Sequence, residues 1–173
     1  CGPCATYSTE FLIEQGYAPT MYYYNPNIHP YKEWLRRKES LEKFAELKQI
    51  PLLLDEEYEL SAFLQQTVFH EQERCGYCYR MRLEKTARKA KEVGVSSFGT
   101  TLLISPYQNR ELICKVGGEL GEKYNLTFCD LDFRPGFRRS QQLAREYELY
   151  RQGYCGCIFS ERDRYYKPKK DPK

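Results

Sequence analysis

Long apolar segments are missing from the 173-residue sequence. No stretch approaches the roughly 20 apolar residues that a membrane-spanning helix needs, and no signal peptide is visible. The sequence contains neither a P-loop nor a G-x-G-x-x-G motif, which excludes two familiar phosphate-binding loops. It also shows no internal repeat and no low-complexity linker. We therefore expect a cytoplasmic protein without a membrane segment, folded as one domain over residues 1–166, with a basic, disordered tail over residues 167–173.

A strong excess of one charge sign is also missing, because the formal net charge is only +3. Basic residues nevertheless cluster locally, in Arg36-Arg37-Lys38, in Arg138-Arg139 and in the tail. Local patches matter more than the sum for binding to nucleic acid, so the charge neither demands nor excludes such a partner. The 16 tyrosines supply stacking surface for bases but equally suit helix and sheet packing.

Cysteine, by contrast, is plentiful, with eight residues, six of them in close pairs: Cys1/Cys4, Cys75/Cys78 and Cys155/Cys157. Eight cysteines in a secreted protein would suggest four disulfides, whereas close pairs in a cytosolic protein suggest metal or redox sites. The close spacing and the ordinary helix and strand patterning favour the cytosolic interpretation.

Apolar periodicity and turn residues predict that helices alternate with strands. Helices are expected after Cys4, over 31–48, within 55–66, over 79–93, from 105 and over 137–150; strands are expected within 18–24, 50–54, 97–104 and 126–131. This alternation predicts an α/β fold with a parallel sheet and helices on both faces. Ligands bind outside the carboxyl ends of such strands. Each cysteine pair lies in a connection or at a helix start, so the three pairs can converge at one edge of the sheet.

The Cys75-x-x-Cys78 motif stands at the start of a predicted helix, where its two sulfurs share one face. Unpaired amides and the helix dipole at such a position favour thiolate over thiol. Alone, the motif fits metal ligation, redox chemistry or chance equally well. In Cys155-Gly156-Cys157, the glycine permits a tight turn that aims both sulfurs inward.

Six sulfurs exceed the four ligands of one zinc ion or one iron–sulfur cluster. Either one pair does redox work beside a metal, or two metal centres share the group. The simpler alternative is a four-cysteine zinc staple with a spare pair. Cys1-Gly-Pro-Cys4 also matches the dithiol of thioredoxin-like oxidoreductases, but there a single pair suffices and the motif follows a strand.

The remaining candidate residues admit plainer roles. Cys114 and Cys129 are expected to be small buried hydrophobic residues, and His29 and His70 to be loop residues rather than ligands. Asp130 and Asp132 follow a predicted strand, where a carboxylate can bind metal, transfer a proton or cap the next helix.

With these residues in view, the chain closely resembles the cobalamin-independent epoxyqueuosine reductase family of iron–sulfur tRNA-modification enzymes. The matching stretches span almost the whole chain: Cys1-Gly-Pro-Cys4-Ala, Tyr24-Asn-Pro-Asn-Ile-His-Pro-Tyr31, Arg74-Cys-x-x-Cys-Tyr-Arg-Met-Arg-Leu83, Phe98-Gly-Thr-Thr-Leu-Leu-Ile-Ser-Pro-Tyr-Gln108, Asp132-Phe-Arg-Pro-Gly-Phe137 and Leu149-Tyr-Arg-Gln-Gly-Tyr-Cys-Gly-Cys-Ile-Phe-Ser-Glu161. The family normally begins with an apolar strand ending in two adjacent cysteines, of which Cys1 corresponds to the second. The resemblance therefore implies an N-terminally truncated sequence that lacks a central strand.

The resemblance also implies a Rossmann-like sheet of the nucleotide alpha-hydrolase (HUP) type, a [4Fe–4S] cluster and a neighbouring mononuclear iron. The six paired cysteines would share these two centres. The implied reaction reduces epoxyqueuosine to queuosine in the anticodon loop of tRNA, with electrons from an unidentified donor. Asp132, Tyr77 and Tyr154 are the candidate proton donors, Asp132 being alternatively an iron ligand. Candidate phosphate contacts are Arg36-Arg37, Arg80, Arg82 and Arg138-Arg139, unless these are solvated helix faces. The rival of a different class is a non-catalytic, zinc-stapled RNA-binding domain.

Overall fold

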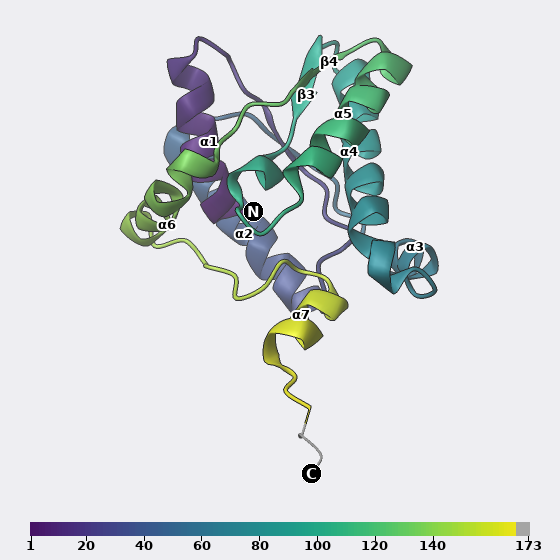
Figure 1. The fold of residues 1–173 in the computed structure, drawn as a ribbon. Helices are drawn as coiled ribbons and strands as arrows, with labels where there is room; N and C mark the ends of the chain where they lie inside the picture. The colour runs from purple at the N-terminus through teal and green to yellow at the C-terminus, as the bar shows by residue number, and fades with distance from the viewer. Residues whose placement is uncertain (169–173) are drawn as a thin grey trace.

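The fold, a computed structural model that describes residues 1–168, alternates helices with very short strands (Figure 1). The α-helices, 3₁₀ helices (η) and strands follow in the order α1 (Gly2–Glu14), β1 (Met21–Tyr23), α2 (Tyr31–Lys48), β2 (Leu52–Leu54), α3 (Leu60–Thr67), η1 (Glu71–Glu73), α4 (Arg74–Glu92), β3 (Ser97–Gly99), η2 (Thr101–Ile104), α5 (Arg110–Tyr124), β4 (Thr127–Cys129), η3 (Arg134–Gly136), α6 (Phe137–Glu146) and α7 (Ile158–Tyr165).

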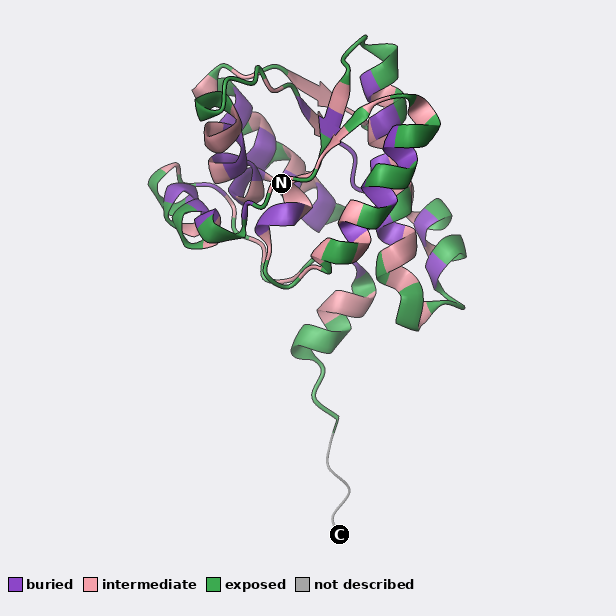
Figure 2. Ribbon diagram, turned by 45° about the horizontal axis from the view of Figure 1, so that its top comes forward, coloured by how far each residue is buried: buried purple, intermediate pink, exposed green. Residues whose placement is uncertain are grey.

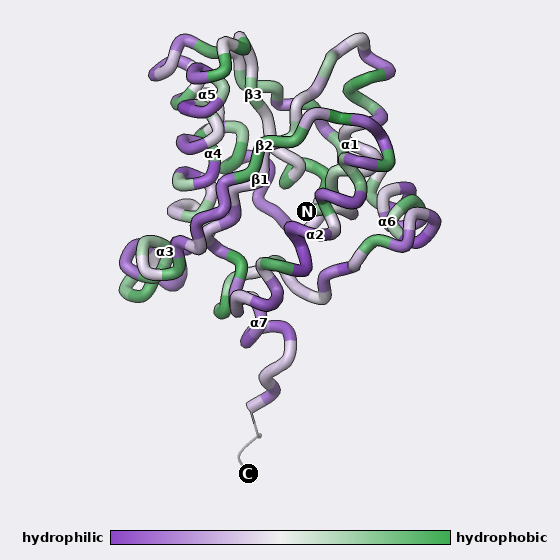
Figure 3. Tube along the Cα trace, turned by 180° about the vertical axis from the view of Figure 1, so that it is seen from behind, coloured by the Kyte–Doolittle hydropathy of each residue, from purple (hydrophilic) through white to green (hydrophobic). Residues whose placement is uncertain are grey.

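The strands pair in parallel, as predicted for an α/β chain, but they form two separate pairs within the described residues. In one pair, Met21 of β1 lies opposite Leu52 of β2. In the other, Phe98 of β3 lies opposite Phe128 of β4. Seen from behind, α4 and α5 lie on one side of the strands and α1 and α6 on the other (Figure 3). The predicted α/β class is thereby confirmed.

A cavity of about 570 Å³ lies between the two strand pairs. Tyr22 of β1 and Gly99 of β3 both line it, so the facing edges of the two pairs border the same space. Leu12 of α1 and Leu83 of α4 close it from the sides. This space separates the strands that a continuous sheet would join.

Each strand pair has its own hydrophobic core, as the buried faces in Figure 2 show. One core joins α4 and α5 to β3 and β4: Tyr79, Leu83, Ala87, Phe98, Leu103, Ile104, Ile113, Val116, Leu120 and Phe133. The other joins α2 and α6 to β1 and β2: Met21, Tyr23, Ile28, Trp34, Leu41, Phe44, Ala45, Ala144 and Leu149.

Helix α1 connects the two cores. Ala5 is buried in the core around α2, whereas Phe11 packs its ring edge-on against Phe133 of the other core, with 5.8 Å between centroids. The molecule therefore has two α/β halves that α1 joins, and the ion pair between Lys85 of α4 and Asp55, which follows β2, also links them.

Several predicted boundaries are wrong. The strand predicted over 97–104 ends at Gly99, and the apolar residues that follow form η2, whose first turn is capped by the Thr100 side chain accepting from the Leu102 amide. The helix predicted from 105 begins at Arg110, where Asn109 supplies the cap. The helix predicted over 137–150 ends at Glu146, and α7 was not predicted.

Of the predicted tail, Lys167 and Pro168 are exposed and belong to no helix or strand, and residues 169–173 lie outside the described part of the chain. Within residues 1–168, no helix is both long enough and apolar enough to cross a membrane.

Candidate functional site

Helix α4 carries Cys75 and Cys78 in its first turns, as the motif predicts, because the helix begins at Arg74. Cys75 is exposed, whereas Cys78 is buried with 9% of its surface accessible. Cys78 packs with Phe63 of α3 and with Cys157, forming a small cluster apart from the two main cores. The C-x-x-C motif therefore faces the chain segment that precedes α7.

Burial sets the protonation of these two thiols. The pKa of Cys78 is raised to about 12, chiefly by burial; the charge of Arg82 opposes the shift, and the neighbouring Cys155 and Cys157 add to it. Desolvation by the surrounding protein also raises the pKa of Cys75, although part of this residue is exposed. The expectation that the helix start favours thiolate is therefore wrong, because desolvation disfavours the charged form of both thiols. Any metal that binds here must displace protons.

The Cys155-Gly156-Cys157 turn needs its glycine, as predicted. Gly156 has φ +139°, a conformation essentially restricted to glycine. A Cβ built on it would lie 2.9 Å from Ile28 Cγ1. The Gly156 carbonyl accepts a 2.8 Å hydrogen bond from the amide of His29, so the turn rests against the loop before α2. Cys157 then caps α7, its Sγ accepting from the amide of Ser160 at 3.3 Å.

Two of the three cysteine pairs converge. Cys78 and Cys157 pack in one buried cluster, and the charges of Cys155 and Cys157 raise the pKa values of both Cys75 and Cys78. We call Cys75, Cys78, Cys155 and Cys157 the four-thiol group.

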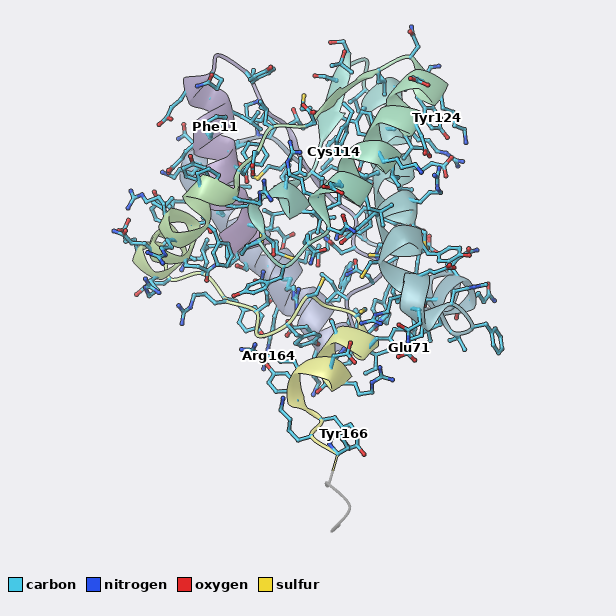
Figure 4. The ribbon with its side chains drawn as sticks, in the orientation of Figure 1. Phe11, Glu71, Cys114, Tyr124, Arg164 and Tyr166 are labelled. Carbon is cyan, nitrogen blue, oxygen red and sulfur yellow. The ribbon has the colours of Figure 1, made fainter. Side chains whose placement is uncertain are left out.

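Helix α7 is fastened to the start of α4. Arg74, next to Cys75, forms an ion pair with Asp163 of α7, and Arg162 of α7 forms one with Glu71 of η1. Both guanidinium groups lie over the ring of Phe159, at 5.6 and 5.9 Å from its centroid. Figure 4 shows Glu71 beside α7. These contacts fix the two cysteine pairs relative to one another.

The third pair, Cys1 and Cys4, lies at the start of α1 and borders this group. Gln152, in the segment leading to Cys155, donates its Nε2 to Cys4 Sγ at 3.6 Å. All three predicted pairs therefore lie in one region, arranged as four thiols and two.

The donor set suits a soft or borderline metal, because all eight cysteines are free and thiolate favours zinc and iron–sulfur clusters. In residues 1–168, however, no three cysteine, histidine or carboxylate side chains stand in positions that would ligate one ion. The sulfurs are neighbours and must turn toward a shared point to bind one. A buried imidazole close by also lacks partners: neither ring nitrogen of His29 is hydrogen bonded within the described chain, and its ring contacts Phe63 at 5.1 Å between centroids.

The predicted proton donors differ in their surroundings. Asp132 is held by Arg134, which donates from Nε at 2.8 Å and Nη2 at 2.6 Å and lowers the pKa of the carboxyl to about 2. Tyr154 donates its hydroxyl to the carbonyl of His29, and burial raises its pKa to about 12. Tyr77 lies between Cys75 and Cys78 in sequence, and its ring packs against that of His70 in a tilted arrangement, with 4.9 Å between centroids.

The two unpaired cysteines lie elsewhere. Cys114 sits on α5, in the upper half of Figure 4, whereas α7 lies at the bottom of that view. Cys129 ends β4 and lines the cavity between the strand pairs. Both are partly buried, in agreement with the packing role predicted for them.

The predicted phosphate contacts separate into exposed and buried groups. Arg37 is buried, with its side chain 1% exposed, so it cannot contact a phosphate at the surface. Arg80 is exposed but paired with Glu119. Arg138 and Arg139 are exposed on α6, where Arg139 is paired with Glu146.

Besides Gln152, sequence reasoning missed two polar side chains that contact the cysteine segments. Gln108 accepts from the Tyr79 hydroxyl at 2.8 Å and donates to Cys155 Sγ at 3.4 Å. Arg37 binds the carbonyls of Tyr154 and Cys155 at 3.0 and 2.8 Å. The quoted 98–108 stretch contains Gln108, but nothing in its spacing indicates contact with a cysteine 47 residues away.

Comparisons with known proteins agree with one another. The family model described as "Epoxyqueuosine reductase QueH" matches residues 1–163. A protein of that name from Dehalococcoides mccartyi is 34% identical over 169 residues, covering 97% of this chain and 92% of the relative. One from Staphylococcus epidermidis is 37% identical over 179 residues, covering 92% of this chain and 73% of the relative. One from Helicobacter pylori is 40% identical over 151 residues, covering 80% of this chain and 41% of the relative.

Proposed function

The chain belongs to the epoxyqueuosine reductase QueH family, and from that premise we propose that it reduces epoxyqueuosine to queuosine at the wobble position of tRNA. Its relatives are named as reductases, which are oxidoreductases. The observation that carries the proposal to this chain is the convergence of the four-thiol group at the starts of α4 and α7. The reaction removes the epoxide oxygen as water and consumes two electrons and two protons. We place it in the cytoplasm, without cobalamin and with an unidentified electron donor.

We further propose that the paired cysteines hold a [4Fe–4S] cluster and a neighbouring iron. Four cysteine thiolates are the ligand set of such a cluster, so the four-thiol group is the candidate for it, and Cys1 and Cys4 are left for the second centre. When bound, these centres would supply electrons singly and Lewis-acid polarisation. The support is chemical, namely free thiols and their arrangement as four and two.

The protein's own acids are ranked by their surroundings. Asp132, with a pKa of about 2, is a carboxylate at neutral pH and therefore suits a ligand better than a proton donor. Tyr154 carries its proton at neutral pH but donates it to the carbonyl of His29. Tyr77, between the two cysteines of α4, is the candidate that we prefer.

The tRNA base would meet the protein at Tyr107. This ring is 84% exposed, the second most exposed of the large hydrophobic side chains in the described chain after Phe69. Phe137 holds it edge-on, at 6.1 Å and 84°, which leaves a face open for stacking on an unstacked base. The next residue, Gln108, reaches Cys155, so the platform lies beside the four-thiol group. Arg138 and Arg139 of α6 are exposed and suit phosphates.

The test combines anaerobic metal analysis with an assay of epoxyqueuosine-containing tRNA, read by mass spectrometry of its nucleosides. The wild type is expected to contain iron and acid-labile sulfide and to form queuosine. Cys78→Ser should lose both the sulfide and the reduction, because Cys78 is the most deeply placed thiol of its pair. Cys114→Ser, the matched control away from α7, should keep both. Tightly bound zinc without labile sulfide, together with no reduction, would overturn the proposal in favour of a zinc-stapled RNA-binding domain. Full activity of Cys78→Ser would overturn the proposed binding of a cluster by Cys78.

A further inference from the structure

The segment between α6 and α7 holds Cys155 and Cys157 yet contains no helix or strand over residues 150–157. Its backbone carbonyls must therefore find partners outside the segment. Three consecutive carbonyls do so: those of Tyr154 and Cys155 accept from the Arg37 guanidinium at 3.0 and 2.8 Å, and that of Gly156 accepts from the His29 amide at 2.8 Å. The position of both sulfurs is thus set by α2 and the loop before it.

Arg37 is unusual because its charge is buried. Its side chain is 1% exposed, and its Nε donates to Glu33 Oε1 at 2.7 Å. Glu33 in turn accepts from the Tyr150 hydroxyl at 2.6 Å through its other oxygen. The guanidinium also lies over the ring of Tyr154, 5.2 Å from its centroid. Glu33 therefore binds the segment at Tyr150, its first residue, and Arg37 binds it at the cysteine turn. The two side chains also neutralise each other's buried charge.

A buried ion pair is weak evidence for stability, because desolvation cancels much of the attraction between the charges. An apolar pair would pack the same space, but it could not bind two adjacent carbonyls. The planar fork of arginine fits that task, and a lysine ammonium fits it poorly. This difference separates a role in placing the turn from a role in stabilising the fold.

We propose that Arg37 is a positioning residue for the Cys155 and Cys157 sulfurs, acting through the carbonyls of Tyr154 and Cys155 and held in place by Glu33. The relevance of this inference to the reaction rests on the proposed function, in which these cysteines bind the metal centres. Its geometry stands on contacts of the metal-free chain, so it can be tested without any reductase activity.

The test is alkylation of the native, metal-free protein, resolved cysteine by cysteine by mass spectrometry. Two variants are compared with the wild type. Arg37→Lys keeps the charge but loses the fork, and the double variant Glu33→Gln/Arg37→Met removes both buried charges while keeping an acceptor for Tyr150. Circular dichroism and urea unfolding establish that each variant is folded.

Cys157, 8% exposed in the wild type, should be alkylated at least about tenfold faster in both variants, because the turn is released from α2. Cys114 and Cys129 serve as internal controls and should react at wild-type rates. A wild-type rate at Cys157 in a folded variant would overturn the proposal, and so would equal acceleration of all three cysteines, which signals general loosening. If the double variant does not fold, Arg37→Lys decides. A wild type without reductase activity would refute the proposed function and leave this result standing.

Discussion

Gly156→Ala should destabilise the protein more than Gly→Ala at either of the other described glycines with positive φ, Gly16 and Gly94. At φ +139° a residue with a Cβ costs about 1–3 kcal/mol in backbone strain. The new Cβ would also lie 2.9 Å from Ile28 Cγ1, 3.2 Å from Asn27 Nδ2 and 3.3 Å from Arg37 Nη1. Crowding of this kind costs about 1–3 kcal/mol. The sum is about 2–6 kcal/mol, with about 4 kcal/mol as the central expectation.

Urea unfolding followed by circular dichroism measures this loss. With a slope of about 2 kcal/mol per molar urea, typical for a protein of this size, a loss of about 4 kcal/mol lowers the midpoint by about 2 M. Gly94→Ala is the matched control, because Gly94 also has positive φ, +74°, but a Cβ there would meet nothing within 4 Å. It should lower the midpoint by about 0.5 M, from strain of about 1 kcal/mol alone. Equal shifts in the two variants would refute the close contact between the turn and the loop before α2.

Two further predictions concern charge and substrate. The side-chain hydrogen bonds of Lys123 and Tyr124 lower the pKa of Glu84 to about 2 from its ordinary value of 4.5, so the ionised carboxylate stabilises the fold fully above about pH 4.5 and this contribution is lost as the pH falls toward 2. Glu84→Gln should therefore shrink the difference between the urea midpoints at pH 6 and pH 3, and an unchanged difference would count against the pairing. Tyr107→Ala should raise KM for tRNA about tenfold, because about 1–3 kcal/mol of base stacking is lost, and should leave kcat nearly unchanged. Replacement of another exposed tyrosine, in Tyr166→Ala, should leave both constants unaltered; a fall in kcat alone would argue against base stacking at Tyr107.

Periodicity in the sequence was a good guide to the helices that bury one face and a poor one to short apolar runs. Trp34, Leu41 and Phe44 recur at helical spacing, and all three are buried along α2. Leu102, Leu103 and Ile104 form an apolar run that suits a strand or a buried helical turn equally well. Tertiary packing decides between these, and it places them in η2.

The cysteine pairs of the candidate site were predictable from the sequence, whereas the side chains that hold the cysteine segments in place were not. Cysteine spacing identified the pairs, and the strand–helix alternation explained why they meet. The spacing of Glu33 and Arg37 is that of an ordinary surface ion pair on a helix. Arg37 is nevertheless buried, because the segment that carries Cys155, 118 residues further along the chain, packs over it. The pKa of Cys78 was misjudged for a similar reason, because burial is a property of the folded chain.

The four-thiol group is attached to both halves of the molecule. Cys75 and Cys78 belong to α4, which contributes to the core around β3 and β4, whereas Arg37 attaches the turn carrying Cys155 and Cys157 to α2, which belongs to the other core. Within residues 1–168 no strand ladder joins the halves. Anything that binds all four sulfurs would add a cross-link between the halves to the contacts that α1 and Lys85 already make, so occupancy of this site should make the unfolding of the two halves more cooperative.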